Sequence, residues 1–119
     1  MRSRQKYIGF AAIALLIAAL VSGCRGQEPV EVPLTILVNN PAAFDDKHIV
    51  TQGVVRHFND PLHYWIEDEA LNRVEIFPHQ KIAPYLGEAV EVEGQFHFSP
   101  KEGRRLTLTR VDVDDCLTC

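Results

Sequence analysis

The sequence gathers two histidines and three aromatic residues around one expected turn. This group consists of His57, Phe58, His63, Tyr64 and Trp65. Residues 59–61 between them read Asn-Asp-Pro, which is a strong turn signal. If the flanking strands form a hairpin with residues 59–61 at its tip, His57 and His63 face each other about 5 Å apart at Cβ. Together with His79 or His97 they could bind a metal, but zinc needs at least three converging ligands, so the metal prediction is weak.

The same group could instead bind an organic ligand. Aromatic rings stack on a base, a sugar or a partner's side chain, and arginines nearby could contact the ligand's polar groups. The predicted ligand-binding set is Arg56, Phe58, Tyr64, Trp65 and Arg73. The alternative is that Trp65 fills the protein interior while the histidines lie at its rim, since large aromatic residues are most often in the core.

No pattern typical of an enzyme occurs in the sequence. It has no Ser-His-Asp spacing, no phosphate-binding loop and no His-Glu-x-x-His motif. Residues 67–69 read Glu-Asp-Glu, but general acid–base catalysis needs a pocket and a tuned pKa, whereas adjacent acids at a strand end usually form a solvated rim. The sequence therefore predicts a protein that is not an enzyme.

Two cysteines, Cys116 and Cys119, close the chain. In an exported protein, such an even pair can oxidise to a disulfide. A single C-x-x-C pair cannot fill the four ligand positions of a structural zinc ion. The disulfide is the first interpretation, and a metal or haem contact is the alternative.

The first 23 residues have the layout of a secretory signal. Arg2, Arg4 and Lys6 precede an apolar run over residues 8–21, and Ser22 and Gly23 follow it, which gives a charged, an apolar and a small-residue region in the expected order. A permanent transmembrane helix is the alternative, but about 20 apolar residues are needed to cross a bilayer.

Residues 20–24 read Leu-Val-Ser-Gly-Cys and resemble the lipobox of bacterial lipoproteins. The resemblance implies that the signal peptide (1–23) is removed and that Cys24 becomes the first residue, carrying diacylglycerol on sulfur and a further acyl chain on nitrogen. Such chains anchor a protein stably to a membrane. Arg25 after the cysteine implies the outer membrane where the cell has one. Residues 24–33, with two prolines, are predicted to form a flexible tether.

The rest of the chain predicts an all-β domain over residues 34–115. Apolar and polar residues alternate, or β-branched residues cluster, in five expected strands. These strands cover residues 48–58, 64–68, 73–77, 89–98 and 105–113. Short helical turns are expected over residues 35–44, with Ile36 and Phe44 packing inward, and over residues 82–87.

Three segments of this domain resemble the bacterial oligonucleotide/oligosaccharide-binding (OB) fold. They read Thr-Gln-Gly-Val-Val at 51–55, Trp-Ile-Glu-Asp at 65–68, and Gly-Glu-Ala-Val-Glu-Val-Glu-Gly at 87–94. The resemblance covers residues 46–113 and implies a five-stranded Greek-key barrel that binds ligands on strands two and three and on the loop between strands one and two. A different small antiparallel barrel or sandwich is the alternative.

Charge narrows the functional classes. Residues 24–119 carry 9 basic and 16 acidic side chains, a net charge of about −7, which excludes a strongly basic nucleic-acid binder. We expect a lipid-anchored binding module outside the cytoplasm, in the cell membrane or outer membrane, that engages a protein, a glycan or a small ligand and needs no cofactor. A local stripe of Arg56, Arg73, Arg104, Arg105 and Arg110 keeps single-stranded nucleic acid as an alternative.

Two further alternatives concern the cell envelope. The OB domain that carries haem in cytochrome c maturation is similar in its strands, and it presents a histidine and then a tyrosine after the last strand. Residues 111–119 contain neither, which leaves a thiol-based metal or haem carrier as the variant to consider. The other alternative is a stress or assembly lipoprotein that acts only through partner proteins.

Overall fold

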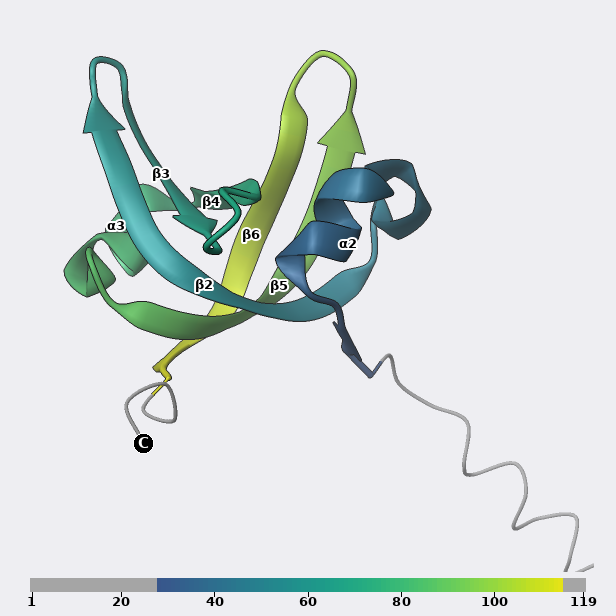
Figure 1. Cartoon of the computed structure of the whole chain (residues 1–119), viewed down its shortest axis with the longest axis horizontal. Coiled ribbons are helices and arrows are strands. Elements are labelled where there is room, and N and C mark those ends of the chain that lie inside the picture. The colour runs from purple at the N-terminus through teal and green to yellow at the C-terminus, as the bar shows by residue number, and fades with distance from the viewer. Residues whose placement is uncertain (1–27, 115–119) are drawn as a thin grey trace, which may run out of the picture.

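Six strands form one curved sheet in the computed structural model, which describes residues 28–114. They are β1 (Val30–Glu31), β2 (His48–Asn59), β3 (Leu62–Glu67), β4 (Arg73–Phe77), β5 (Ala89–Ser99) and β6 (Gly103–Val113). The order is β1-β2-β3-β4-β6-β5, and β5 also pairs with β2, so that β2 to β6 close into a barrel. This confirms the predicted OB-fold-like barrel, with one added strand. Figure 1 shows the β2–β3 and β5–β6 hairpins as two separate arms.

Short helical segments cover the barrel between its strands. Within residues 28–114 they are α2 (Leu34–Asn39), η2 (Pro41–Phe44), α3 (His79–Ile82) and η3 (Ala83–Tyr85). Phe44 packs against the core as expected. The inward position predicted for Ile36 is wrong, because it is 40% exposed while Leu34 and Leu37 are buried. Residues three apart share one face of a helix, so α2 turns the two leucines inward together.

The barrel interior follows the alternation of β5. Val90, Val92 and Phe96 are fully buried, as expected for one face of a strand. Gly94 continues this inward series, and a Cβ there would overlap the backbone carbonyl of Thr107 on β6. The sheet is irregular between Glu93 and Gly94, so glycine lets the two strands approach at the point where the barrel bends.

The last residues of the expected tether belong to the fold, so the tether boundary at residue 33 is wrong. Val30 and Glu31 pair in parallel with β2, and the amide of Val32 donates to the carbonyl of Val50 at 2.9 Å. Val32 is 4% exposed and lies in the core. Burial of this side chain and the backbone pairing offset the entropy lost when the segment is ordered.

The β2–β3 hairpin is tighter than the sequence suggested. Asn59 pairs with Leu62, so the turn contains two residues rather than the expected three. His57 therefore lies opposite Tyr64, not opposite His63. Because successive strand residues point to opposite faces, this change of one residue places the two histidines on opposite sides of the sheet. The predicted facing pair is wrong.

Several predictions fall outside the described residues. They concern the signal segment, the lipid-bearing Cys24, and the pair Cys116 and Cys119. Among the helices of residues 28–114, none has the length and apolar character needed to cross a membrane.

Candidate functional site

One side of the β2–β3–β4 sheet collects the charged and aromatic side chains, and we call it the Trp65 face. It comprises Arg56, Phe58, His63, Trp65, Glu67, Arg73 and Glu75. Val55, Ile66 and Val74 alternate with these residues and are buried in the barrel, so their neighbours along each strand point outward. The structure thus brings together four of the five predicted ligand-binding residues.

Tyr64 is the member of the predicted set that lies elsewhere. Its side chain packs against the barrel core, with its ring stacked on His57 at 5.6 Å between centroids and tilted against His79 at 5.5 Å. It is a structural residue of the opposite face. Among residues 28–114, no three His, Cys, Asp or Glu side chains converge in a way that could hold a metal ion, and His57 and His63 diverge.

Trp65 does not fill the barrel, which was the alternative interpretation of this residue. Its ring lies on the outer face, half-buried by neighbours. The guanidinium carbon of Arg73 lies 4.9 Å from the centre of the indole, and the His63 ring lies 5.1 Å away. The indole N–H donates to Oε1 of Glu67 at 3.0 Å. The ring is therefore fixed in orientation before any ligand arrives.

Glu67 connects the cations of this face. Nε of Arg73 donates to its Oε1 at 3.0 Å, and Nε of Arg56 donates to its Oε2 at 3.3 Å. The Glu67 side chain is 12% exposed, whereas the two arginines are half-exposed. The hydrogen bond from Trp65, aided by both arginines and opposed by burial, lowers the pKa of Glu67 below its ordinary 4.5. The carboxylate therefore stays charged under mildly acidic conditions.

Sequence reasoning placed Glu67 in a solvated acidic rim, and the structure corrects this. A residue two positions after Trp65 on a strand shares its face, and this spacing could have identified Glu67.

Asp68, the neighbour of Glu67, instead orders the β3–β4 loop, because its carboxylate accepts hydrogen bonds from the backbone amides of Ala70 and Asn72, each at 2.9 Å. Burial acts to raise the pKa of Asp68, but the hydrogen bonds from Asn72 and Ala70 outweigh it and lower the pKa.

Two cavities flank the indole of Trp65. The first, about 400 Å³, is lined by Val55, Arg56, His57, Trp65, Glu67, Arg73, Leu86 and Gly87. The second, about 270 Å³, is lined by His63, Trp65, Arg73, Glu75, Glu102, Gly103 and Arg104. Trp65 and Arg73 border both, so a ligand on this face could contact the indole from either side. The second cavity lies between β3, β4 and the end of the β5–β6 hairpin. Of the hairpin residues that line it, the sequence indicated only Arg104, as part of the arginine stripe.

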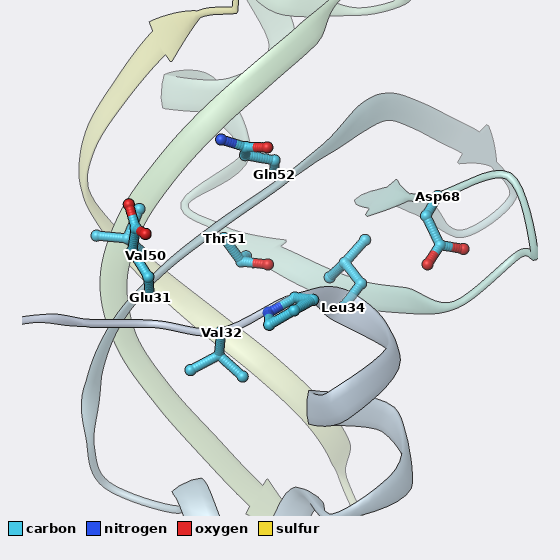
Figure 2. Close-up of a pocket in the computed structure, with 8 residues that line it drawn as sticks. Glu31, Val32, Leu34, Val50, Thr51, Gln52 and Asp68 are labelled. Carbon is cyan, nitrogen blue, oxygen red and sulfur yellow. The ribbon is translucent and has the colours of Figure 1, made fainter.

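A further cavity of about 340 Å³ lies where β1 meets β2. Figure 2 shows Thr51 and Gln52 of β2 on one side of it and Asp68 on the other, with Val32 and Leu34 below. Thr51 is 3% exposed, and its hydroxyl has no hydrogen-bond partner among the described residues. Because the hydroxyl is covered, the polar side chains that this cavity offers a ligand are those of Glu31, Gln52 and Asp68.

A second charged network lies on β2, β5 and β6, away from the Trp65 face. Glu93 accepts from Nε2 of His48 at 2.8 Å and from Nε of Arg110 at 3.0 Å. Arg110 also contacts Glu91 and Asp112. The hydrogen bond to Glu93 raises the pKa of Arg110, and the bonds from His48 and Arg110 lower the pKa of Glu93. This network ties three strands together and leaves Arg110 surrounded by acids.

No protein-family model matches this sequence, and a comparison with curated proteins finds no match. Among solved structures, the chain is similar to the hypothetical protein ygiW from E. coli, with a TM-score of 0.53 and 11% identity over 76% of this chain and 100% of that chain. It also matches the SSB domain of a Synechococcus sp. protein, with a TM-score of 0.41 and 17% identity over 54% of this chain and 91% of that one. The likeness to the E. coli structure supports the fold and indicates nothing about a ligand.

Proposed function

We propose that this protein is a lipid-anchored binding module of the bacterial cell envelope that binds a saccharide on its Trp65 face. The observation that carries the proposal is the position of Trp65. Its indole is held on the outer face of β3 by Glu67, with a cavity on either side. OB folds bind oligosaccharides and oligonucleotides on this region of the barrel, which agrees with that position.

The polar groups around the indole suit a sugar. The C–H side of a sugar ring packs on an aromatic face, while its hydroxyls both donate and accept hydrogen bonds. In the second cavity, the carboxylates of Glu75 and Glu102 can accept from hydroxyls, and Arg104 can donate to them. Acceptors and donors thus lie within one cavity beside one aromatic platform.

A single-stranded nucleic acid fits this face less well. Binding a phosphate backbone depends on cations that neutralise successive phosphates, but Glu67, Glu75 and Glu102 lie among the arginines of the Trp65 face and its second cavity. The net charge of about −7 over residues 24–119 also opposes binding of a phosphate backbone.

The lipid anchor is the second part of the proposal. If Cys24 carries the acyl chains, only residues 25–29 separate it from β1, which corresponds to a reach of about 20 Å at full extension. The domain would lie close to the lipid headgroups. The tips of both hairpins lie at the end of the barrel opposite β1 in Figure 1, so they would point away from the membrane.

The anchor is tested with the variant Cys24→Ala. The wild-type protein should fractionate with membranes, and its mature mass should include the acyl chains, whereas the variant should accumulate as soluble protein or uncleaved precursor. The substitution Cys116→Ala is the matched control and should leave fractionation unchanged. Full-length, unacylated wild-type protein in the cytosol would contradict the proposal.

Saccharide binding is tested by fluorescence, because Trp65 is the single tryptophan of the chain. A panel of neutral and acidic oligosaccharides is titrated into the mature domain, and at least one should shift or quench the Trp65 emission in a saturable way. Calorimetry with Trp65→Leu should then show at least a ten-fold loss of affinity. The control Ile36→Ala, at an exposed position of α2 that lines neither cavity, should keep the affinity. Binding of a thymidine oligonucleotide with no saccharide response would assign the face to nucleic acid instead.

A further inference from the structure

We infer that the saccharide bound by this protein carries an acidic group, and that Arg56 and Arg73 bind this group in the first cavity beside Trp65. The inference rests on the proposed function and names its ligand class. Both arginines line that cavity. They come from strands on either side of β3 and meet at the carboxylate of Glu67.

Glu67 holds each arginine by one nitrogen only. Arg56 and Arg73 both use Nε to reach the carboxylate. Within residues 28–114, the terminal guanidinium nitrogens (Nη1 and Nη2) of these two side chains have no hydrogen-bond partner. Guanidinium groups bind carboxylates and phosphates through paired N–H donors. The anchored Nε thus leaves the outer donors of two arginines available on the exposed side of the cavity.

The local charge balance favours an anion at this position. Among the residues that line the first cavity, the guanidiniums of Arg56 and Arg73 share the one carboxylate of Glu67, which leaves one positive charge in excess there. The other ion pairs in the described part of the chain lack such an excess. Arg110 contacts three acids, and Arg105 pairs with Glu102. On a chain that is acidic as a whole, this excess distinguishes the first cavity from the second, which Glu75 and Glu102 also line.

The arginines are also positioned before the ligand binds. Long side chains lose rotamer freedom when they are ordered at an interface, and this loss opposes binding. Here Glu67 already restricts both, and Arg73 lies over the indole at 4.9 Å. Both arginines have therefore lost much of their rotamer entropy before a ligand binds. An acidic group on a sugar stacked against Trp65 would contact donors that are close to their bound positions.

The carboxylate of a uronic acid and the phosphate of a phosphorylated sugar offer the same chemistry to two guanidiniums. An experiment can separate these sources from a neutral sugar. The probes are an oligogalacturonate, its neutral methyl ester, and inorganic phosphate. The readouts are the Trp65 emission and the Nε–H signals of the arginines in a ¹H–¹⁵N spectrum.

We expect oligogalacturonate to bind at least ten-fold tighter than its methyl ester, and phosphate to shift the Arg56 and Arg73 signals without changing those of Arg110. Arg56→Gln should remove the preference for the acid, and Arg73→Lys should weaken it because lysine lacks the paired donors. The matched control Lys81→Gln removes one positive charge from α3 and should leave the preference intact.

Two results would overturn the inference, and they differ in whether the proposed function also fails. If Trp65 responds equally to the acid and the ester and phosphate shifts neither arginine, the face binds saccharides without selecting an acidic group, and the proposed function stands. If phosphate and oligogalacturonate leave both arginines unchanged and no saccharide alters Trp65, the inference and the proposed function both fail.

Discussion

The indole N–H of Trp65 donates a 3.0 Å hydrogen bond to Oε1 of Glu67, two residues further along the same strand. The same oxygen accepts from Arg73, whose guanidinium also lies over the indole ring. Three side chains therefore restrain one another on the outer face of the barrel. The charge state of Glu67 thereby influences the surroundings of the only tryptophan in the chain.

Trp65 fluorescence should therefore titrate with Glu67. The pKa of Glu67 is lowered from 4.5, so on acidification the emission should change with a midpoint below 4.5, while the protein remains folded. Protonation weakens the charge-assisted hydrogen bonds from Trp65 and both arginines. Glu67→Gln should abolish this transition. The control His63→Gln removes the imidazole beside the indole and should retain it; a transition that persists in Glu67→Gln would assign the titration to another group.

Acid should also destabilise the fold through the Glu93 network. A carboxylate whose pKa is lowered in the folded protein contributes stability above its unfolded value of 4.5, and this contribution is lost as the pH falls through the lower folded value. We expect the melting temperature to fall below about pH 4.5. Glu93→Gln should cost about 1–2 kcal/mol at pH 7 and flatten this dependence.

Glu102→Gln is the matched control for the Glu93 network. Glu102 is exposed at the β5–β6 hairpin and pairs only with Arg105 among the described residues, so its substitution should change stability by less than about 0.5 kcal/mol. Thermal unfolding of the three proteins between pH 3 and pH 7 checks the prediction. Identical pH profiles for wild type and Glu93→Gln would show that the network contributes nothing to acid stability.

The strands were largely predictable because their periodicity is local. In β5, every second residue from Val90 to Phe96 is buried, and the expected span 89–98 differs by one residue from Ala89–Ser99. Strand β1 was missed because Val30 and Glu31 lie between two prolines and are too short to show a period. Val30 and Glu31 adopt a strand conformation because they pair with β2. This pairing is a tertiary contact, which a local sequence pattern does not reveal.

The site was only partly predictable because it depends on register. Arg56, Trp65 and Arg73 were identified by residue type, but Tyr64 and His63 exchange faces when the turn shortens from three residues to two. Glu67 was missed for a related reason. Its role arises from partners on β2, β3 and β4 together, and only the folded sheet brings these three strands side by side.

Gly94 should tolerate no side chain. A Cβ at this position would overlap the backbone carbonyl of Thr107, and a backbone cannot rotate away as a side chain can. Gly94→Ala should destabilise the domain by about 3 kcal/mol. Gly53→Ala is the comparison, because its nearest backbone atoms lie at 3.0 and 3.1 Å, so it should cost less. Denaturant unfolding measures both, and an equal cost would contradict the close approach of β5 and β6 at Gly94.

The segment before α2 should contribute to stability, which a flexible tether would not do. Val32 is 4% exposed within the core, so Val32→Ala removes buried methyl groups and should cost about 2 kcal/mol. Val30 precedes it on β1 but is 47% exposed, and Val30→Ala should therefore change stability by less than about 0.5 kcal/mol. Denaturant unfolding of the two variants compares matched truncations two residues apart. If both are neutral, the segment is not packed on the barrel, and the reach of about 20 Å inferred for the lipid anchor lengthens accordingly.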